Sequence, residues 1–92
     1  MARIVVTMRI MPTSPDVNLS ELEHEAKKHI ISFAGNTEFK VEQKPVAFGL
    51  QSLNITFLMD ENKGSTESVE KQIASCVGVN SVEVIDVRRT IG

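Results

Sequence analysis

Two histidines and a single cysteine are the residues of this 92-residue chain best suited to bind a metal or to act as a nucleophile. His24 and His29 are five positions apart, whereas two ligands on one face of a helix need a spacing of three or four. Cys76 has no second cysteine to help complete a zinc site. We therefore expect surface or structural roles for the histidines, and no metal site.

Four carboxylates between residues 60 and 70 raise the question of a calcium loop: Asp60, Glu61, Glu67 and Glu70. An EF-hand alternates its ligands along the loop and closes it with a glutamate, and this segment does neither. Acidic side chains near a helix N-terminus are stabilised by the helix dipole. The segment is therefore interpreted as a solvated turn that leads into a helix.

A catalytic site needs groups that converge, and the sequence offers no such set. There is no glycine-rich phosphate loop, and no serine, histidine and aspartate stand in an order typical of a triad. We therefore expect a protein that binds a partner without converting it, and that needs no cofactor.

Length and charge narrow the class of protein further. Ninety-two residues are enough for one domain, residues 1–92, and leave no room for a second core. The net charge of -2 disfavours direct binding to nucleic-acid phosphates. The apolar stretch at residues 1–12 is too short and interrupted for a membrane span or a signal peptide. Because a lone cysteine suits a reducing compartment, a cytoplasmic protein is predicted.

Strands are predicted where apolar and polar residues alternate. The four segments with this pattern are residues 3–11, 38–44, 50–60 and 81–91. In the last of them the apolar phase shifts between Val84 and Ile85, which indicates a β-bulge.

Two helices are predicted from apolar residues at spacings of three and four. The first begins after Asn18, a favourable N-cap, and ends at Gly35. The second is expected to begin with Ser65 as its N-cap and to end at Gly78. Its apolar stripe comprises Val69, Ile73, Cys76 and Val77. Because Cys76 falls on this stripe, a buried and unreactive thiol is expected.

The order of these elements, βαββαβ, predicts an α+β fold. Each helix has one apolar stripe and each strand one apolar face, which favours two helices on one side of a four-stranded antiparallel sheet, the ferredoxin-like sandwich. The other sheet face is polar and expected to be solvated. RNA-binding sandwiches of this topology stack bases on aromatic side chains there, and this face has none on its predicted first and third strands.

The stretch KPVAFGLQSL, residues 44–53, places an aromatic side chain at a predicted turn. Phe48 is one of only four aromatic residues, and it stands between Pro45 and the adjacent Gly49. Two interpretations are open. Phe48 packs back onto its own core, or it is displayed so that a partner can bury it.

From this turn onward the sequence resembles the guanine-nucleotide exchange domain of elongation factor 1-beta. In that family a Pro-x-x-Phe-Gly turn leads into a long strand, an acidic turn ending in lysine, a serine-capped helix and a final strand. The matching residues are Pro45, Phe48, Gly49, Leu53, Asp60, Glu61, Lys63, Ser65 and Ile73. Pro12 and the NLSEL stretch also fit, so the resemblance covers essentially the whole chain.

The resemblance implies that the chain binds the GDP-bound GTPase elongation factor 1-alpha and promotes exchange of GDP for GTP. In such domains the turn phenylalanine packs against the GTPase, which implies this role for Phe48, with Gly49 beside it. The task needs no covalent chemistry, so the resemblance also implies that the chain is not an enzyme.

A lysine near the C-terminus of the family reaches the magnesium and phosphate site of the GTPase. This chain ends in DVRRTIG, which leaves Arg88 and Arg89 as the candidates for that role. Successive strand residues point to opposite faces, so only one of them is expected to meet the partner. Lys63 and Lys44 are expected to be rim contacts of small individual effect.

A different class of function stays open at this point, because a fold alone does not select a function. Ferredoxin-like sandwiches also serve as small-molecule-binding or regulatory domains that act as dimers. That alternative predicts a stable dimer with a metabolite pocket. The exchange-factor interpretation predicts a monomer that gains its partner on mixing.

Overall fold

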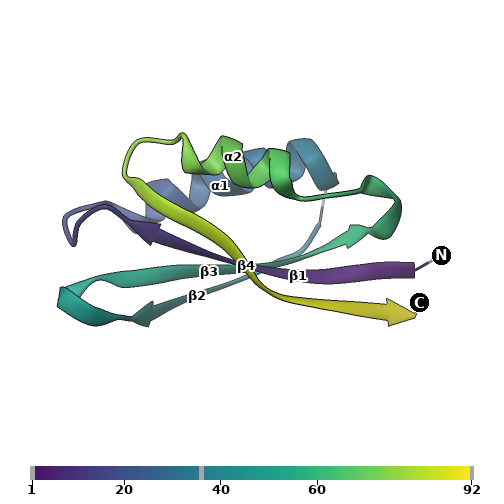
Figure 1. Ribbon diagram of the computed structural model, residues 1–92, viewed down its shortest axis with the longest axis horizontal. Helices are drawn as coiled ribbons and strands as arrows, with labels where there is room; N and C mark the ends of the chain where they lie inside the picture. The colour runs from purple at the N-terminus through teal and green to yellow at the C-terminus, as the bar shows by residue number, and fades with distance from the viewer. Residues whose placement is uncertain (1, 36, 92) are drawn as a thin grey trace.

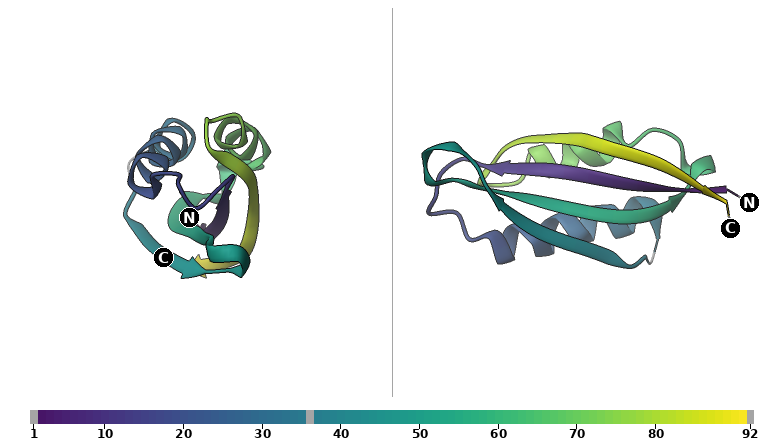
Figure 2. Two further views of the ribbon diagram at one scale, coloured as in Figure 1. Left: turned by 90° about the vertical axis from the view of Figure 1, so that its left-hand side faces the viewer. Right: turned by 90° about the horizontal axis from the view of Figure 1, so that it is seen from below.

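The computed structural model describes residues 2–35 and 37–91. It contains a four-stranded antiparallel sheet in the order β2-β3-β1-β4. Both helices cover one face of this sheet and leave the other open (Figures 1 and 2). The predicted α+β, ferredoxin-like sandwich is thus confirmed. The elements are β1 (Ala2–Pro12), α1 (Leu19–Ala34), β2 (Phe39–Pro45), β3 (Gln51–Asp60), α2 (Glu67–Ala74) and β4 (Val79–Ile91).

The hydrophobic core lies between the helices and the two central strands. β1 and β3 pair so that Val6 lies opposite Phe57 and Met8 opposite Ile55, and all four side chains are buried. This is the apolar face that the alternation predicted. The first helix contributes Leu22, Ala26 and Ile30 to the same core, and the second contributes Val69 and Ile73, two of the four residues of its predicted stripe. None of the helices in residues 2–35 and 37–91 is long and apolar enough to cross a membrane.

The start of α1 follows its predicted cap. The Asn18 side-chain oxygen accepts hydrogen bonds from the backbone N–H groups of Ser20 and Glu21, at 3.0 and 3.2 Å. Those groups have no partner within the helix, so the asparagine satisfies two of them. Gly35 ends the helix with a φ of 84°, in the left-handed region that favours glycine.

The bounds predicted for the second helix are wrong at both ends. α2 begins at Glu67 with Thr66 in the N-cap position, although the Ser65 hydroxyl accepts a hydrogen bond from the Glu67 N–H at 3.1 Å. It ends at Ala74, because the Ser75 hydroxyl donates to the Gln72 carbonyl at 2.7 Å and the chain then turns tightly.

This early end changes the positions of Cys76 and Val77. The Cys76 N–H donates to the Ile73 carbonyl, and the Val79 N–H donates to the Cys76 carbonyl, so both residues belong to a turn. Cys76 is half-buried instead of buried, and the expectation of an enclosed thiol is corrected. Val77 is not a core residue at all, since its side chain is 99% exposed.

The predicted bulge in the last strand is confirmed. β4 pairs with β1 so that Asp86 lies opposite Thr7 and Val84 opposite Met8, which leaves Ile85 without a partner. An extra residue in one strand restores the phase of the side chains on either side of it. Val82 and Val84 accordingly pack against the core, while Ile85 is exposed.

The open face of the sheet is polar, as predicted, but not fully solvated. Ser52 and Asn54 are only 2% and 8% exposed. The Ser52 hydroxyl lies 3.3 Å from the Asn54 side-chain oxygen, and the hydroxyls of Thr7 and Thr56 lie 3.0 Å apart across β1 and β3. The Ser52 hydroxyl therefore has a hydrogen-bond partner although it is buried, as buried polar groups in folded proteins usually do.

Candidate partner-binding site

Phe48 lies at the tip of the β2–β3 connection, in a short 3-10 turn η1 (Ala47–Gly49). The Val46 N–H donates to the Leu50 carbonyl at 2.8 Å and closes the connection. The Phe48 side chain is 93% exposed, so the interpretation that it packs onto its own core is wrong. A large aromatic ring left in water at a hairpin tip is available to a partner.

The backbone at this tip is strained in a way that holds the ring outward. Phe48 has φ 63° and ψ 30°, and it is the only residue other than glycine with a positive φ in the described part of the chain. A bulky residue in the left-handed region costs about 1–2 kcal/mol, and such strain gathers at functional sites. Gly49 follows with φ 74°, where it avoids a second penalty of the same kind.

Lys44 lies beside this tip on the open face of the sheet. It pairs with Ser52, one pair before the end of the β2–β3 ladder, and it is exposed. Three of the predicted site residues, Lys44, Phe48 and Gly49, therefore share one end of the molecule.

Arg88 and Arg89 lie on opposite faces of β4, as expected for neighbours in a strand. Arg88 lies opposite Val5 on the open face, and its Nε donates to the Asp86 carboxylate at 3.0 Å. Arg89 lies opposite Ile4 on the helix side, and its Nη2 donates to the Glu61 carboxylate at 3.0 Å. Both guanidinium groups are well exposed and paired within the chain.

Lys63 is the last residue of a short turn that begins with Glu61, the residue whose carboxylate pairs with Arg89. This turn, η2 (Glu61–Lys63), follows β3 directly, and the Asp60 carboxylate accepts a hydrogen bond from the Asn62 N–H at 2.8 Å. The acidic residues thus cap and flank a turn, as the sequence predicted. In residues 2–35 and 37–91 no three His, Cys, Asp or Glu side chains gather closely enough to hold a metal ion.

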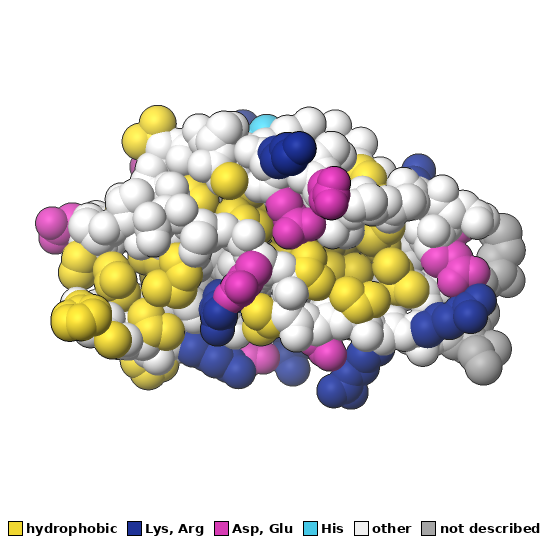
Figure 3. Space-filling model, viewed as in Figure 1, with side chains coloured by type: hydrophobic (Ala, Val, Ile, Leu, Met, Phe, Trp, Pro, Cys, Tyr) yellow, Lys and Arg dark blue, Asp and Glu magenta, His cyan; other side chains and the backbone are white. Residues whose placement is uncertain are grey.

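The predicted site residues form two groups at opposite ends of the sheet. Phe48 precedes the ten-residue strand β3 and Lys63 follows it, so the strand alone separates them by about 30 Å. The Cα atoms extend over 42 Å along the longest axis of the molecule. Figure 3 shows hydrophobic side chains at the end with the β2–β3 connection and also over the middle of the same face, while basic and acidic side chains lie along its lower edge and at the opposite end.

The contrast between the two ends was missed by sequence reasoning, because the segments involved are far apart in the chain. The end with Phe48 is built from three connections, residues 12–17, 45–51 and 75–79, in which Asp16 is the only charged residue. We call it the uncharged end. The single sequence signal that pointed to it was the Phe-Gly turn.

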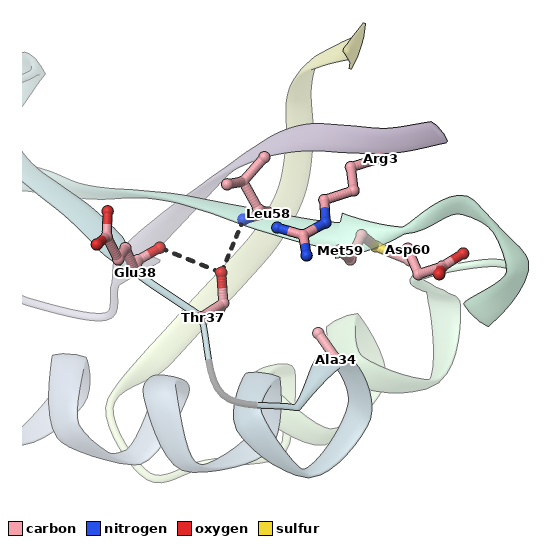
Figure 4. A pocket seen from close by; sticks show the side chains of 7 residues that line it. All are labelled: Arg3, Ala34, Thr37, Glu38, Leu58, Met59 and Asp60. Carbon is pink, nitrogen blue, oxygen red and sulfur yellow. Dashed lines mark hydrogen bonds between the residues drawn. The ribbon is translucent and has the colours of Figure 1, made fainter. Parts of the chain in front are cut away.

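We call the opposite end, which carries η2 with Lys63 and the last residues of β4 with Arg88 and Arg89, the charged end. It contains an open cavity of about 480 Å³ (Figure 4). It lies where β2 starts too late to cover the last residues of β3, and the Thr37 hydroxyl there accepts from the Leu58 N–H at 3.2 Å. Its lining residues are Arg3, Ala34, Thr37, Glu38, Leu58, Met59 and Asp60. One cation and two carboxylates around an open hollow make no convergent catalytic set.

Cys76 is the remaining group with reactive chemistry, and its surroundings keep it protonated. Its Sγ lies 3.6 Å from His29 Nε2 and 3.6 Å from the Gln72 carbonyl. Partial burial, and secondly the negative charge of Glu25, raise the pKa of this thiol above its ordinary value. A nucleophilic cysteine needs the opposite shift.

Comparison with known proteins identifies the family of the chain. Residues 5–90 match the family described as the EF-1 guanine nucleotide exchange domain. The chain is 45% identical over 92 residues to elongation factor 1-beta of Methanobrevibacter smithii, which covers 97% of this chain and 98% of that protein. It is 38% identical over 89 residues to elongation factor 1-beta of Methanothermobacter thermautotrophicus, with the same coverage.

A solved structure shares the fold. LarC2, the C-terminal domain of a cyclometallase involved in the synthesis of the NPN cofactor of lactate racemase, superimposes with a TM-score of 0.58 over 99% of this chain. This chain spans 58% of that one, and the sequence identity is 14%, so the likeness concerns the fold alone.

The match over residues 5–90, on a ferredoxin-like sandwich, shows a domain of the EF-1 guanine nucleotide exchange family. The chain belongs to the elongation factor 1-beta family, at 30–45% identity to its archaeal members over nearly the full length.

Proposed function

We propose that this chain binds the GTPase elongation factor 1-alpha in its GDP-bound form and accelerates the release of GDP, so that GTP takes its place. Membership of the elongation factor 1-beta family supports this activity. The structural observation that carries it is the exposed Phe48, held outward by a left-handed backbone.

Exchange requires only that the nucleotide and this chain weaken each other's binding to the GTPase, and linkage makes that coupling reciprocal. In the proposal, the Phe48 ring fills an apolar pocket on the GTPase and stabilises its nucleotide-poor shape. Gly49 sets the direction of the hairpin, and Lys44 contacts the rim of the pocket. The free energy for displacing GDP thus comes from burying a ring that water surrounds in the free chain.

The charged end acts on a separate part of the GTPase. Arginine forms bidentate hydrogen bonds with phosphate and carboxylate oxygens, so Arg88 or Arg89 competes there for phosphate oxygens or for acidic magnesium ligands. Lys63 adds a rim contact. Because about 30 Å of strand separates these residues from Phe48, the partner must present two surfaces at a similar spacing.

The proposal also includes the oligomeric state, location and cofactor requirement of the chain. It works as one exchange domain over residues 1–92, as a monomer when free, in the cytoplasm and without a cofactor or catalytic residue. It does not contact nucleic acid or a membrane directly, since its net charge is -2 and ion pairs neutralise many of its cations.

Release of a fluorescent GDP analogue from elongation factor 1-alpha tests the activity. We expect the release rate to rise with the concentration of this chain and then to saturate, with excess unlabelled GTP present to prevent rebinding. Catalytic amounts should suffice, because each molecule leaves once GTP has bound. Equal release rates with and without an excess of the chain would refute the proposal.

A further inference from the structure

Among the large apolar side chains of residues 3–35 and 37–90, the most exposed is not Phe48 but Val77. It lies in the turn between α2 and β4, at 99% exposure. The turn is held in place, because the Thr13 N–H donates to the Gly78 carbonyl at 2.9 Å and Gly78 adopts φ 90° against the Val17 side chain. Val77 is therefore presented by a fixed turn.

A continuous surface connects this turn to the Phe48 hairpin. One hollow of about 560 Å³ lies between the start of α1 and the 75–78 turn, where Leu22, Cys76 and Val77 help to line it. A second hollow of about 300 Å³ reaches Gly49. Val17 and Asn18 line both hollows, so the two hollows are adjacent and share these residues as a common wall.

The size of this end makes a contact restricted to Phe48 difficult. The Cα atoms extend over 21 and 18 Å across the two shorter axes, a cross-section of roughly 400 Å². A standard protein interface covers about 800 Å² on each partner. A globular partner seated on the Phe48 tip with such a footprint therefore also reaches the 75–78 turn.

The composition of this end fits an interface centre better than a solvated rim. Interface cores are depleted in charge, and the three connections of this end contain one charged residue, Asp16, among 18 residues, in a chain that is 24% charged. The charged side chains of Lys44, Glu21 and Glu25 border these connections. Val46, Phe48 and Val77 are all exposed there. Single exposed apolar residues are ordinary, but a whole end with this composition is not.

We propose that Val77 and the 75–78 turn form a second contact with the same elongation factor 1-alpha molecule that receives Phe48. This inference rests on the proposed function. Val77 supplies binding free energy, and the two contacts together fix the orientation in which the charged end approaches the GTPase.

Val77→Ser tests this contact, with Ile31→Ser as the matched control, since Ile31 is an exposed apolar residue on α1. We expect Val77→Ser to raise the concentration needed for half-maximal GDP release about tenfold, and to leave the melting temperature unchanged because the side chain buries nothing. Ile31→Ser should match the wild type in exchange. An unchanged half-maximal concentration for Val77→Ser overturns the inference.

Phe48→Ala, measured in parallel, distinguishes failure of the inference from failure of the function. If Phe48→Ala weakens exchange and Val77→Ser does not, the exchange function stands and the second contact is wrong. If the wild-type chain does not accelerate GDP release, both are wrong. If sedimentation finds the free chain dimeric and Val77→Ser makes it monomeric, a second copy occupies this surface and the inference is also overturned.

Cys76 offers an independent readout, because the only cysteine of the chain adjoins Val77. Its alkylation by a small maleimide can be followed by mass spectrometry of this chain, with and without saturating GDP-bound elongation factor 1-alpha. We expect severalfold slower alkylation in the complex, and no slowing at the same concentration for Phe48→Ala. Equal rates in the free chain and the saturated complex contradict the proposed contact.

Discussion

At the scale of the residue, the outward position of Phe48 depends on a backbone conformation that phenylalanine rarely adopts. Its φ of 63° costs free energy in the folded state, and the surrounding hairpin tolerates it because the closing Val46–Leu50 hydrogen bond and Gly49 fix the neighbouring backbone. We therefore expect Gly49 to matter for the direction in which the Phe48 ring is held.

Gly49→Ala tests the role of that glycine. Its φ of 74° is unfavourable for alanine, while no atom lies within 4 Å of the position that a Cβ would take. We expect a loss of about 1 kcal/mol in the free energy of unfolding, measured in urea, and weaker exchange because the hairpin tilts. Gly49→Asn should recover most of the loss, since asparagine tolerates the left-handed region. Equal effects of alanine and asparagine would point to a steric cause instead.

The chemistry of Cys76 provides a second prediction at this scale. Burial and the Glu25 charge raise the pKa of its thiol, so alkylation at pH 8 should be slower than for a free cysteine and should accelerate as the pH rises further. The protonated form is favoured by folding. Its contribution to stability is therefore complete below the ordinary thiol pKa and is lost as pH rises through the raised value.

Glu25→Gln separates the two causes of this pKa shift. Removing the carboxylate charge should accelerate alkylation at pH 8 without reaching the rate of a free cysteine, because burial is the larger cause. A rate unaffected by Glu25→Gln would show that the carboxylate has no influence on the thiol.

At the scale of the element, β4 determines which of its two arginines faces which way. The bulge at Ile85 sets the phase of the residues that follow, so that Arg88 lies on the open face and Arg89 on the helix side. Arg89 shares its corner with η2, which contains Lys63, whereas Arg88 pairs with the carboxylate of its own strand.

Alanine substitutions at the two arginines should therefore have unequal effects on exchange. We expect Arg89→Ala to slow GDP release more than Arg88→Ala, since Arg89 is bonded to Glu61 of η2, the turn that also contains the candidate contact Lys63. Each loss of an exposed ion pair should change the free energy of unfolding by less than about 1 kcal/mol. The measurement is the rate of GDP release at a saturating concentration of each variant. Urea unfolding of the same variants is the control for stability. Equal effects, or a larger effect at Arg88, would contradict this assignment.

The strands could be predicted from the sequence more accurately than the end of the second helix. The strands followed from alternation, because one buried face imposes a period of two, and even the bulge left a phase shift between Val84 and Ile85. The end of α2 did not follow. The periodicity continued to Val77, but the competition of the Ser75 hydroxyl for a helix carbonyl is a local effect that apolar spacing does not encode.

The candidate site was predictable only in part for a related reason. The turn around Phe48 could be placed by Pro45 and Gly49, whose backbone preferences are local. The position of Val77 at the same end as Phe48 depends on how three connections that are distant in the sequence meet at one end of the sheet. The positive φ of Phe48 likewise depends on the folded hairpin. No spacing rule within a single segment could bring them together.

At the scale of the whole molecule, connections that contain one charged residue and the turn with Lys63 lie at opposite ends of the 42 Å axis. In the proposed function the first end supplies most of the affinity and the second acts on the nucleotide site. Apolar contacts respond little to salt, whereas exposed charges are screened within about 10 Å at 0.1 M ionic strength.

This separation predicts different salt effects on two kinetic quantities. Between 0.1 and 0.5 M KCl, the concentration of the chain for half-maximal exchange should change less than about twofold, because the docking end is nearly uncharged. The maximal rate should fall more strongly, relative to the intrinsic GDP release measured at each salt concentration. A half-maximal concentration that rises steeply with salt would show that charges dominate docking.

The most direct test of the whole account is Phe48→Ala, measured for both exchange and thermal stability. Loss of a central aromatic anchor costs about 2–4 kcal/mol of binding, so we expect the concentration for half-maximal GDP release to rise at least about 30-fold. The melting temperature should not fall, because the ring buries nothing in the free chain. Unchanged exchange together with a lower melting temperature would contradict the account, since it would mean that Phe48 serves the fold and not the partner.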